Sequence, residues 1–243
     1  MGLLTTNELK KLHQKKYRQQ FGCFLAEGEH LAQELQKATH ANPALRASEL
    51  YVTEKNQDWP SDLPKHVVSD KLMKQISDTP SPQGIVACVP ITAVLAASAA
   101  DERGVYLHRI QDPGNLGTIL RTLAWFGGFR CLLSQDSVDP FNSKAVRASM
   151  GAIFHVALET DVSMETLTER YEEIACLEPG GASLQSADFH QAACLAFGSE
   201  AAGLPAALLQ RPGMKTFGIP GSGRIESLNL ASTVNMCVYE LCR

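Results

Sequence analysis

The feature that most constrains this chain is a regular alternation of short apolar runs and helix-like segments after residue 103. The apolar runs lie at 104–110, 129–134, 155–158, 193–198 and 215–220. The helix-like segments between and after them include 164–175 and the closing segment 227–243. This repeated alternation of strand and helix predicts a parallel sheet that is covered by helices on both faces. The C-terminal part, 104–243, is therefore expected to be an α/β domain.

The N-terminal part, 1–92, alternates strands and helices on a smaller scale and is expected to form a compact α/β domain of its own. An Ala-rich linker at 93–103 separates the two parts. Ser69 or Asp70 is expected to cap a helix that follows a short strand. The expected elements are helices at 7–20 and 24–38, strands at 49–53 and 84–91, a strand followed by a helix at 66–77, and a Pro-rich loop at 78–84.

Composition excludes several classes of protein. Of the 243 residues, 44% are hydrophobic and 20% are charged, which is an ordinary globular balance. There is no run of 18 apolar residues and no secretory signal, so we expect no membrane span and a cytoplasmic location. The seven cysteines have irregular spacing and form no C-x-x-C pair, so the sequence predicts neither a metal site nor a redox motif. Free thiols fit a reducing cytosol.

The net charge of −4 argues weakly against a nucleic-acid partner, but basic residues gather in one short segment. Local clusters matter more than total charge for phosphate binding. Taken alone, such a cluster is more often a solvated helix face than an RNA contact. The residues of this basic segment are Lys10, Lys11, Lys15, Lys16 and Arg18.

Three glycine-containing turns follow predicted strands, and each carries polar side chains. In an open parallel sheet, ligands bind at the carboxyl ends of the strands, so these turns are the place to look for a site. The first turn, 112–121, holds Asn115 and Arg121 at the start of a predicted helix. A helix N-terminus with a nearby arginine suits a phosphate group. An ordinary strand–helix turn with a surface arginine explains this segment equally well.

The other two turns also carry polar side chains. The second, 197–205, places Glu200 in a short loop, where a helix-capping role is the simpler interpretation on its own. The third, 219–229, ends in Ser227 and Asn229, which taken alone would be an N-cap and a first-turn residue of the closing helix. The three turns together are far more specific than any one of them.

Taken in order, N-x-G-x-x-x-R at 115–121, G-x-E-x-x-G-L at 198–204 and S-L-N at 227–229 resemble the three signature motifs of the SpoU (TrmH) family of RNA methyltransferases. The segment 143–156 between the first two motifs is also similar to that family. The resemblance covers roughly 104–243. The N-terminal part is similar to the L30e-like RNA-binding domain that precedes the catalytic domain, through Lys16, Arg18, Phe24, Glu27, Gly28 and the loop 81–85.

The resemblance implies a fold, a reaction and a set of site residues. The fold would be the SPOUT type, whose third-motif region is tied into a trefoil knot, a rare exception among proteins. The reaction would transfer a methyl group from S-adenosylmethionine to a ribose 2′-hydroxyl of structured RNA, either ribosomal or transfer RNA. The implied catalytic residues are Asn115, Arg121, Glu200, Ser227 and Asn229. The implied cofactor-binding residues are Gly198, Leu204, Ile219, Pro220, Leu228 and Leu230.

The resemblance also implies partners. Members of the family are homodimers, and the apolar closing helix suits burial in a dimer interface, although it suits the core of a monomer equally well. With the family in view, RNA contacts are expected from the basic segment and from one further arginine. The expected RNA-contacting residues are Lys10, Lys11, Lys15, Lys16, Arg18 and Arg147.

Two alternatives compete with this interpretation. A non-catalytic RNA-binding relative would keep the fold, but a decayed enzyme is expected to have lost at least one of the five catalytic residues. A dinucleotide-dependent oxidoreductase would also show strands followed by glycine turns. Its fingerprint needs a third glycine, and an acidic residue about twenty positions further on. The glycine is absent from 112–121, and Asp136 is the only acidic candidate.

Overall fold

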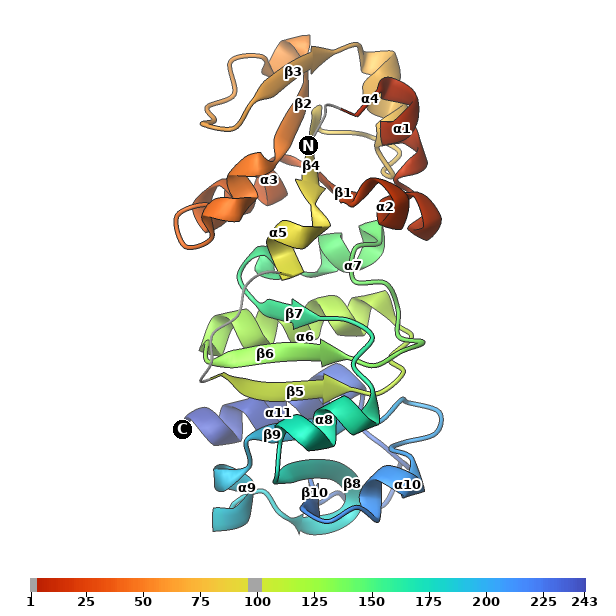
Figure 1. Ribbon diagram of the computed structural model, residues 1–243, viewed down its shortest axis with the longest axis vertical. Helices are drawn as coiled ribbons and strands as arrows, with labels where there is room; N and C mark the ends of the chain where they lie inside the picture. Colours follow the sequence, from red (N-terminus) through yellow and green to blue (C-terminus); the bar gives the residue numbers. More distant parts are fainter. Residues whose placement is uncertain (1–3, 96–101) are drawn as a thin grey trace. The chain divides into compact units, whose positions relative to one another are not determined.

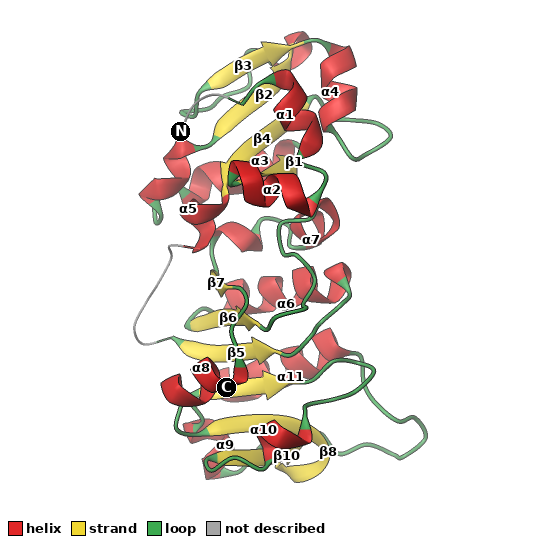
Figure 2. Cartoon of the chain, turned by 45° about the vertical axis from the view of Figure 1, so that its right-hand side comes forward, coloured by secondary structure: helices red, strands yellow, loops and turns green. Residues whose placement is uncertain are grey.

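The computed structural model describes residues 4–95 and 102–243, which fall into two compact units. The first unit comprises Met1–Ser98 and Asp139–His155, and the second comprises Ala99–Val138 and Val156–Arg243. Of the predicted linker 93–103, residues 96–101 lie outside the described residues. Within the described residues, no helix is long and apolar enough to cross a membrane. Figures 1 and 2 show the elements of both units.

The first unit is built on a four-stranded sheet with the order β1-β4-β2-β3. Strand β4 pairs antiparallel with both neighbours, whereas β2 and β3 are parallel. The strands are β1 (Cys23–Glu27), β2 (Glu49–Thr53), β3 (Lys65–Val68) and β4 (Ile85–Pro90). The helices are α1 (Thr6–Lys11), α2 (Lys15–Phe21), α3 (Glu29–Ala38), α4 (Asp70–Ile76) and α5 (Ile91–Leu95), with 3₁₀ turns η1 (Pro43–Ala47) and η2 (Glu54–Asn56).

Several predictions for this unit are confirmed. The strands expected at 49–53 and 84–91 are β2 and β4, and every residue of β4 is buried. The segment 66–77 does contain a strand followed by a helix. The Ser69 hydroxyl caps α4 by accepting the backbone N–H of Leu72. These segments are short, with unambiguous turn or capping residues at their ends.

Two helix predictions for this unit are wrong. The helix expected at 24–38 is strand β1 followed by α3, because Gly28 with φ +104° turns the chain between them and 23–27 pair with β4. The helix expected at 7–20 is two helices, α1 and α2. In a continuous helix the Leu12 carbonyl would accept the N–H of Lys16. Here that carbonyl accepts Nη1 of Arg18 at 2.7 Å.

Residues 139–155, which the sequence places in the C-terminal part, complete the first unit. They form α7 (Ser143–Ala148) and the 3₁₀ turn η3 (Ala152–Phe154), which contact β1 and α3. The ring of Phe24 lies 4.9 Å from that of Phe141 and 6.5 Å from that of Phe154. Gly151 has φ +90°, and a Cβ there would lie 2.4 Å from Cβ of Glu34. Only glycine allows this close approach of η3 to α3.

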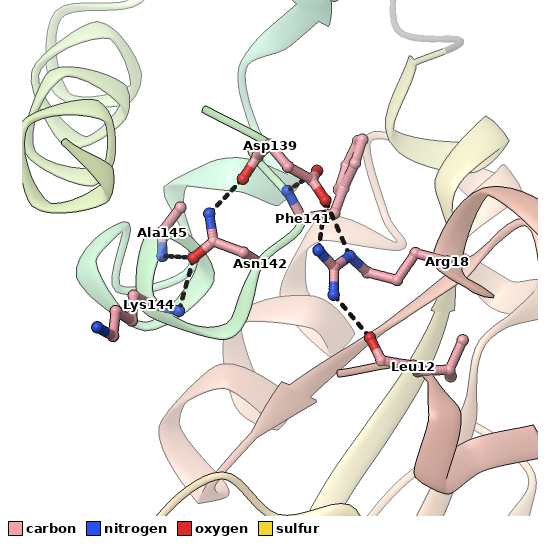
Figure 3. Close-up of polar contacts among 7 residues, drawn as sticks. All are labelled: Leu12, Arg18, Asp139, Phe141, Asn142, Lys144 and Ala145. Atoms are coloured by element: carbon pink, nitrogen blue, oxygen red, sulfur yellow. Dashed lines mark hydrogen bonds and ion pairs between the residues drawn. The ribbon is translucent and has the colours of Figure 1, made fainter. Parts of the chain in front are cut away.

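A buried ion pair joins the same segment to α2. Arg18, which is 4% exposed, donates Nε and Nη2 to Oδ2 of Asp139 at 3.0 and 2.5 Å. Asn142 begins α7 by accepting the backbone N–H groups of Lys144 and Ala145. Figure 3 shows both sets of contacts. Each of the three nitrogens of the Arg18 guanidinium therefore donates to an oxygen atom of the first unit.

The second unit contains a six-stranded sheet with the order β10-β8-β9-β5-β6-β7. All neighbouring strands are parallel, as the alternation in the sequence predicts. Helices α6 and α11 lie on one face of the sheet, and α8 on the other (Figure 1). The strands are β5 (Arg103–Leu107), β6 (Phe129–Leu133), β7 (Ala157–Glu159), β8 (Ile174–Ser183), β9 (Cys194–Phe197) and β10 (Met214–Gly218). The helices are α6 (Pro113–Phe126), α8 (Met164–Arg170), α9 (Ala187–Gln191), α10 (Ala206–Leu209) and α11 (Leu230–Cys242).

Strand β8 corrects the sequence prediction for this unit. The helix expected at 164–175 ends at Arg170, and β8 begins at Ile174. Ile174 and Cys176 pack into a core with Tyr106 of β5, the strand on the far side of β9. The second half of β8 has the composition of a loop, with a proline and two glycines. It is extended because it pairs with β10, across a register shift between Thr216 and Phe217.

Candidate active site

A cleft of about 810 Å³ lies in the second unit, beside the middle of β8, the ends of β9 and β10, and the loop 219–229 that leads into α11. Five of the six predicted cofactor-binding residues line it: Gly198, Ile219, Pro220, Leu228 and Leu230. The sixth, Leu204, is 6% exposed and packs in the core of the second unit instead. The cleft therefore gathers residues from two of the three turns that the sequence singled out.

Two glycines allow backbone segments to cross tightly beside the cleft. A Cβ at Gly198 would lie 2.0 Å from the carbonyl carbon of Gly203 and 2.3 Å from the nitrogen of Leu204. A Cβ at Gly218 would lie 2.7 Å from the carbonyl oxygen of Glu178. A side chain at either position would push these backbones apart and reshape the wall of the cleft.

A relay of three side chains links the three turns. The Asn229 amide donates to Oδ1 of Asn115 at 3.0 Å, and the Asn115 amide donates to Oε1 of Glu200 at 2.6 Å. The direction of the relay follows from the helix caps. Oδ1 of Asn229 accepts the N–H of Ser232 and caps α11. The hydrogen bond from Asn229 to Asn115 therefore comes from the amide nitrogen of Asn229, which can only donate. The relay ends on a carboxylate, where a charge-assisted hydrogen bond is strongest.

A backbone hydrogen bond also fixes the position of Asn115. It lies in the first turn of α6, and its N–H donates to Oδ1 of the N-cap residue Asp112 at 2.6 Å. Ser227 and Glu200 both line the cleft. The structure thus brings Asn115, Glu200 and Asn229 into contact and places Ser227 at the same cleft.

Arg121 does not join this cluster. Its side chain is exposed on α6, and it forms no hydrogen bond or ion pair with any residue that the structure describes. Six residues separate it from Asn115, which corresponds to about 240° around a helix, so the two side chains leave α6 in different directions. Arg121 shares its stripe of α6 with Trp125, four residues further on, which is 84% exposed.

The predicted RNA-contacting residues divide into two groups. Lys11, Lys15 and Lys16 are exposed and Lys10 is half-buried on α1 and α2, and Lys11 and Lys16 also lie over the ring of Tyr17. Arg18 was wrongly predicted as an RNA contact, because its guanidinium is buried against Asp139. Arg147 is half-buried and donates two hydrogen bonds of 3.2 Å to Asp78.

The four buried cysteines of the second unit are held in the thiol form. Burial raises the pKa of Cys131, Cys176 and Cys237 to about 12, and raises that of Cys194 further. All seven cysteines are free, as the sequence predicts. Among the described residues, no group of three or more metal-binding side chains comes together.

Sequence reasoning missed part of the cleft wall. Glu178 and Pro179 come from β8, whose first residues were predicted as the end of a helix and whose remaining residues were assigned to no element. Phe197 is the last residue of β9 and Phe217 the last but one of β10; both strands were predicted, yet no motif marked these residues as lining the cleft. A large apolar residue just before a glycine, near the carboxyl end of a parallel strand, is the pattern that would have identified both.

The comparisons with known proteins agree in both units. Residues 102–239 match the model of the SpoU rRNA Methylase family, and residues 5–87 match that of the MRM3-like substrate binding domain. The chain is 32% identical to the 23S rRNA (guanosine(2553)-2′-O)-methyltransferase RlmP of Bacillus subtilis, over 96% of this chain and 93% of RlmP.

Two solved structures are similar over nearly the whole chain. An RNA methyltransferase of the TrmH family from Porphyromonas gingivalis has a TM-score of 0.82 at 29% identity, covering 99% of this chain and 98% of that one. An AdoMet-bound rRNA methyltransferase from Sinorhizobium meliloti has a TM-score of 0.79 at 25% identity, covering 97% and 93%. The second structure was solved with the methyl donor in place.

Proposed function

This chain belongs to the SpoU rRNA Methylase family, and from that premise we propose that it transfers a methyl group from S-adenosylmethionine to a ribose 2′-hydroxyl of ribosomal RNA. The observation that carries the proposal is the meeting of the three family motifs through Asn115, Glu200 and Asn229 beside a cleft. A non-catalytic relative would have no reason to keep this relay intact.

The cleft fits the methyl donor. Its volume of about 810 Å³ lies in the range of cofactor sites, and Phe197, Ile219 and Leu228 supply apolar walls for a flat adenine ring. Gly198 and Gly218 leave backbone groups open to approach. S-adenosylmethionine, when bound, supplies an activated methyl group attached to a positively charged sulfur. The residues proposed to hold it are Gly198, Ile219, Pro220, Leu228 and Leu230, with Leu204 supporting them from the core.

The polar residues would align the acceptor. Methyl transfer is an in-line displacement, so the main task is to hold the attacking oxygen in line with the methyl carbon. We assign this task to Asn115, Ser227 and Asn229, with Glu200 fixing the orientation of the Asn115 amide. Arg121 would bind an RNA phosphate and place the ribose. Its guanidinium keeps its own proton, so a phosphate or another oxygen would accept the proton of the hydroxyl.

Arg121 suits a site built with a second subunit. Trp125 and Phe126 on α6 and Met236 and Tyr239 on α11 are exposed apolar residues, and the rings of Phe126 and Tyr239 meet edge to face at 6.3 Å. An exposed patch of this kind favours burial against another protein surface. A homodimer formed through it would carry Arg121 to the interface. We also expect the family's trefoil knot around the third motif.

The dimer has a direct test. Replacing both Trp125 and Tyr239 by Glu puts two charges on the patch, and sedimentation should then find monomers where the unaltered chain forms dimers. Activity should fall with the dimer, because Arg121 would lose its place beside the site. An unaltered chain that sediments as a monomer would contradict the proposed interface.

The first unit would select the RNA. It matches a substrate-binding domain, and its exposed lysines Lys11, Lys15 and Lys16, together with Lys10, suit phosphate contacts. Affinity for RNA should therefore fall steeply with salt. Ribosomal RNA and seven free cysteines both suit the cytoplasm, where we place the protein.

The decisive experiment maps 2′-O-methyl groups in RNA from cells with and without the gene. We expect one ribosomal position to lose its methyl group, and purified protein with labelled S-adenosylmethionine to restore it. Loss of a transfer-RNA methyl group instead would redirect the proposed substrate. If no position changes and purified protein binds RNA without labelling it, the non-catalytic alternative holds.

A further inference from the structure

The cleft has an unusual charge balance for a site that works beside RNA. Its described lining includes three glutamates, Glu178, Glu200 and Glu226, and no lysine, arginine or histidine. A concave wall lined by one sign of charge concentrates its field in the cleft and favours ligands of the opposite charge. The lining therefore favours a cation over a neutral ligand of the same shape.

Glu178 is the glutamate that the fold holds firmly in this lining. It is half-buried on β8, and its Oε1 accepts the backbone N–H of Leu204 at 3.2 Å. Glu200 is already engaged with Asn115, and Glu226 lies on an exposed loop. Among the described residues, Glu178 has no cationic partner. A partly buried carboxylate without one is costly, so a bound cation would stabilise it.

The two nucleoside ligands of the proposed reaction differ in charge. S-adenosylmethionine carries a sulfonium, an ammonium and a carboxylate, so its net charge is positive. When the oxygen–methyl bond forms, the sulfur–methyl bond breaks and its electron pair stays on sulfur, while the hydroxyl proton leaves. The remaining S-adenosylhomocysteine is a neutral zwitterion. Each turnover thus removes one positive charge from the cleft.

We propose that Glu178 is a specificity-determining residue that recognises the positive charge of the methyl donor, so that the cleft binds donor more tightly than product. The inference rests on the proposed function, because it takes the cleft to be the cofactor site. As a consequence, the loss of one positive charge in methyl transfer lowers the affinity of the cleft for the product and favours product release.

Calorimetric titration of the full chain with three ligands tests this inference without measuring turnover. The ligands are S-adenosylmethionine, S-adenosylhomocysteine and sinefungin, a cationic analogue in which a carbon that bears an amino group replaces the sulfur that bears the methyl group. Glu178→Gln removes the charge, while its amide oxygen can still accept the N–H of Leu204. Glu169→Gln, an exposed residue of α8, is the matched control for loss of a carboxylate elsewhere.

We expect Glu178→Gln to weaken both cationic ligands on the order of tenfold and to leave S-adenosylhomocysteine within about twofold. Glu169→Gln should change none of the three by more than about twofold. An equal loss for all three ligands, or no loss for any, would overturn the inference. If the variant fails to fold, the affinities of the unaltered chain still test the inference, because equal affinity for sinefungin and S-adenosylhomocysteine would overturn it. Failure of the unaltered chain to bind any of the three would instead count against the proposed function.

Discussion

Arg18 and Arg121 are both arginines that the sequence marks as functional, but their environments in the two units are opposite. Arg18 is buried in the first unit, where Asp139 and the Leu12 carbonyl satisfy its guanidinium. Arg121 is exposed in the second unit and has no partner among the described residues. A guanidinium with its hydrogen bonds satisfied inside the protein stabilises a fold, whereas one left open can bind a phosphate.

Individual acidic residues show the same contrast. In the first unit, Asp139 and Asp78 pair with Arg18 and Arg147. At the cleft of the second unit, Glu178 is hydrogen bonded to a backbone N–H but has no basic partner among the described residues. The difference indicates which charges hold a structure together and which remain available to ligands. Four predictions test it.

The largest effect is expected at Arg121. Arg121→Ala should lower methyl transfer to ribosomal RNA by about 100- to 1,000-fold, because an arginine that places the reacting groups contributes on that scale. Its side chain is exposed, so the free energy of unfolding and the Kd for S-adenosylmethionine should stay nearly unchanged. Labelled methyl transfer and calorimetry measure the two quantities. Retained turnover would remove Arg121 from its proposed role.

Arg18 should show the opposite pattern. Arg18→Leu leaves Asp139 buried without its cation, which should destabilise the first unit by about 3 kcal/mol. Trp59 lies in the first unit and Trp125 in the second. In a Trp125→Phe background, urea unfolding followed by the fluorescence of Trp59 therefore reports the first unit. Replacing Arg18 and Asp139 together by Leu should restore most of the stability. If Arg18→Leu lowers the free energy of unfolding as little as Arg121→Ala does, the contrast between the two arginines is wrong.

Asn229 has two roles: its side-chain oxygen caps α11, and its side-chain amide donates to Asn115 at the site. Two substitutions separate these roles. Asn229→Ser keeps a side-chain oxygen to cap α11 and removes the amide that donates to Asn115. Methyl transfer should fall about tenfold, as expected for loss of one hydrogen bond of about 1.4 kcal/mol, with little change in stability. Asn229→Ala should also lose the cap, at about 1 kcal/mol in urea unfolding. Equal stability of the two variants would contradict the capping role.

The smallest effect is expected from Asp78. The Ser143 hydroxyl and the Arg147 guanidinium lower the pKa of this carboxyl below its usual value. A lowered pKa contributes stability above the unfolded-state pKa of about 4, which is lost as the pH falls through the folded-state pKa. Asp78→Asn should therefore reduce the loss of stability below about pH 4. Because the side chain is 40% exposed, solvent screens the interaction and the change should be small. Thermal unfolding from pH 2 to 6 measures it.

Much of the second unit and its site could be predicted from the sequence. The parallel sheet follows from the alternation of apolar runs and helices, and Asn115, Glu200 and Asn229 lie in turns that end strands or start helices. Such turns meet at one edge of a parallel sheet, so their convergence follows from local pattern. Strand β8 was not predicted, because its second half has the composition of a loop and is extended only through its pairing with β10.

The sequence by itself determined the α/β class, the turns that carry the family motifs and the identity of the polar residues that meet there. Only the tertiary structure decided that 139–155 belongs to the core of the first unit and that Arg18 is part of its scaffold. Arg18 and Asp139 are 121 positions apart. Periodicity and turn chemistry act over a few residues, whereas the burial and pairing of a charge depend on which distant segment packs against it, and no local pattern encodes that choice.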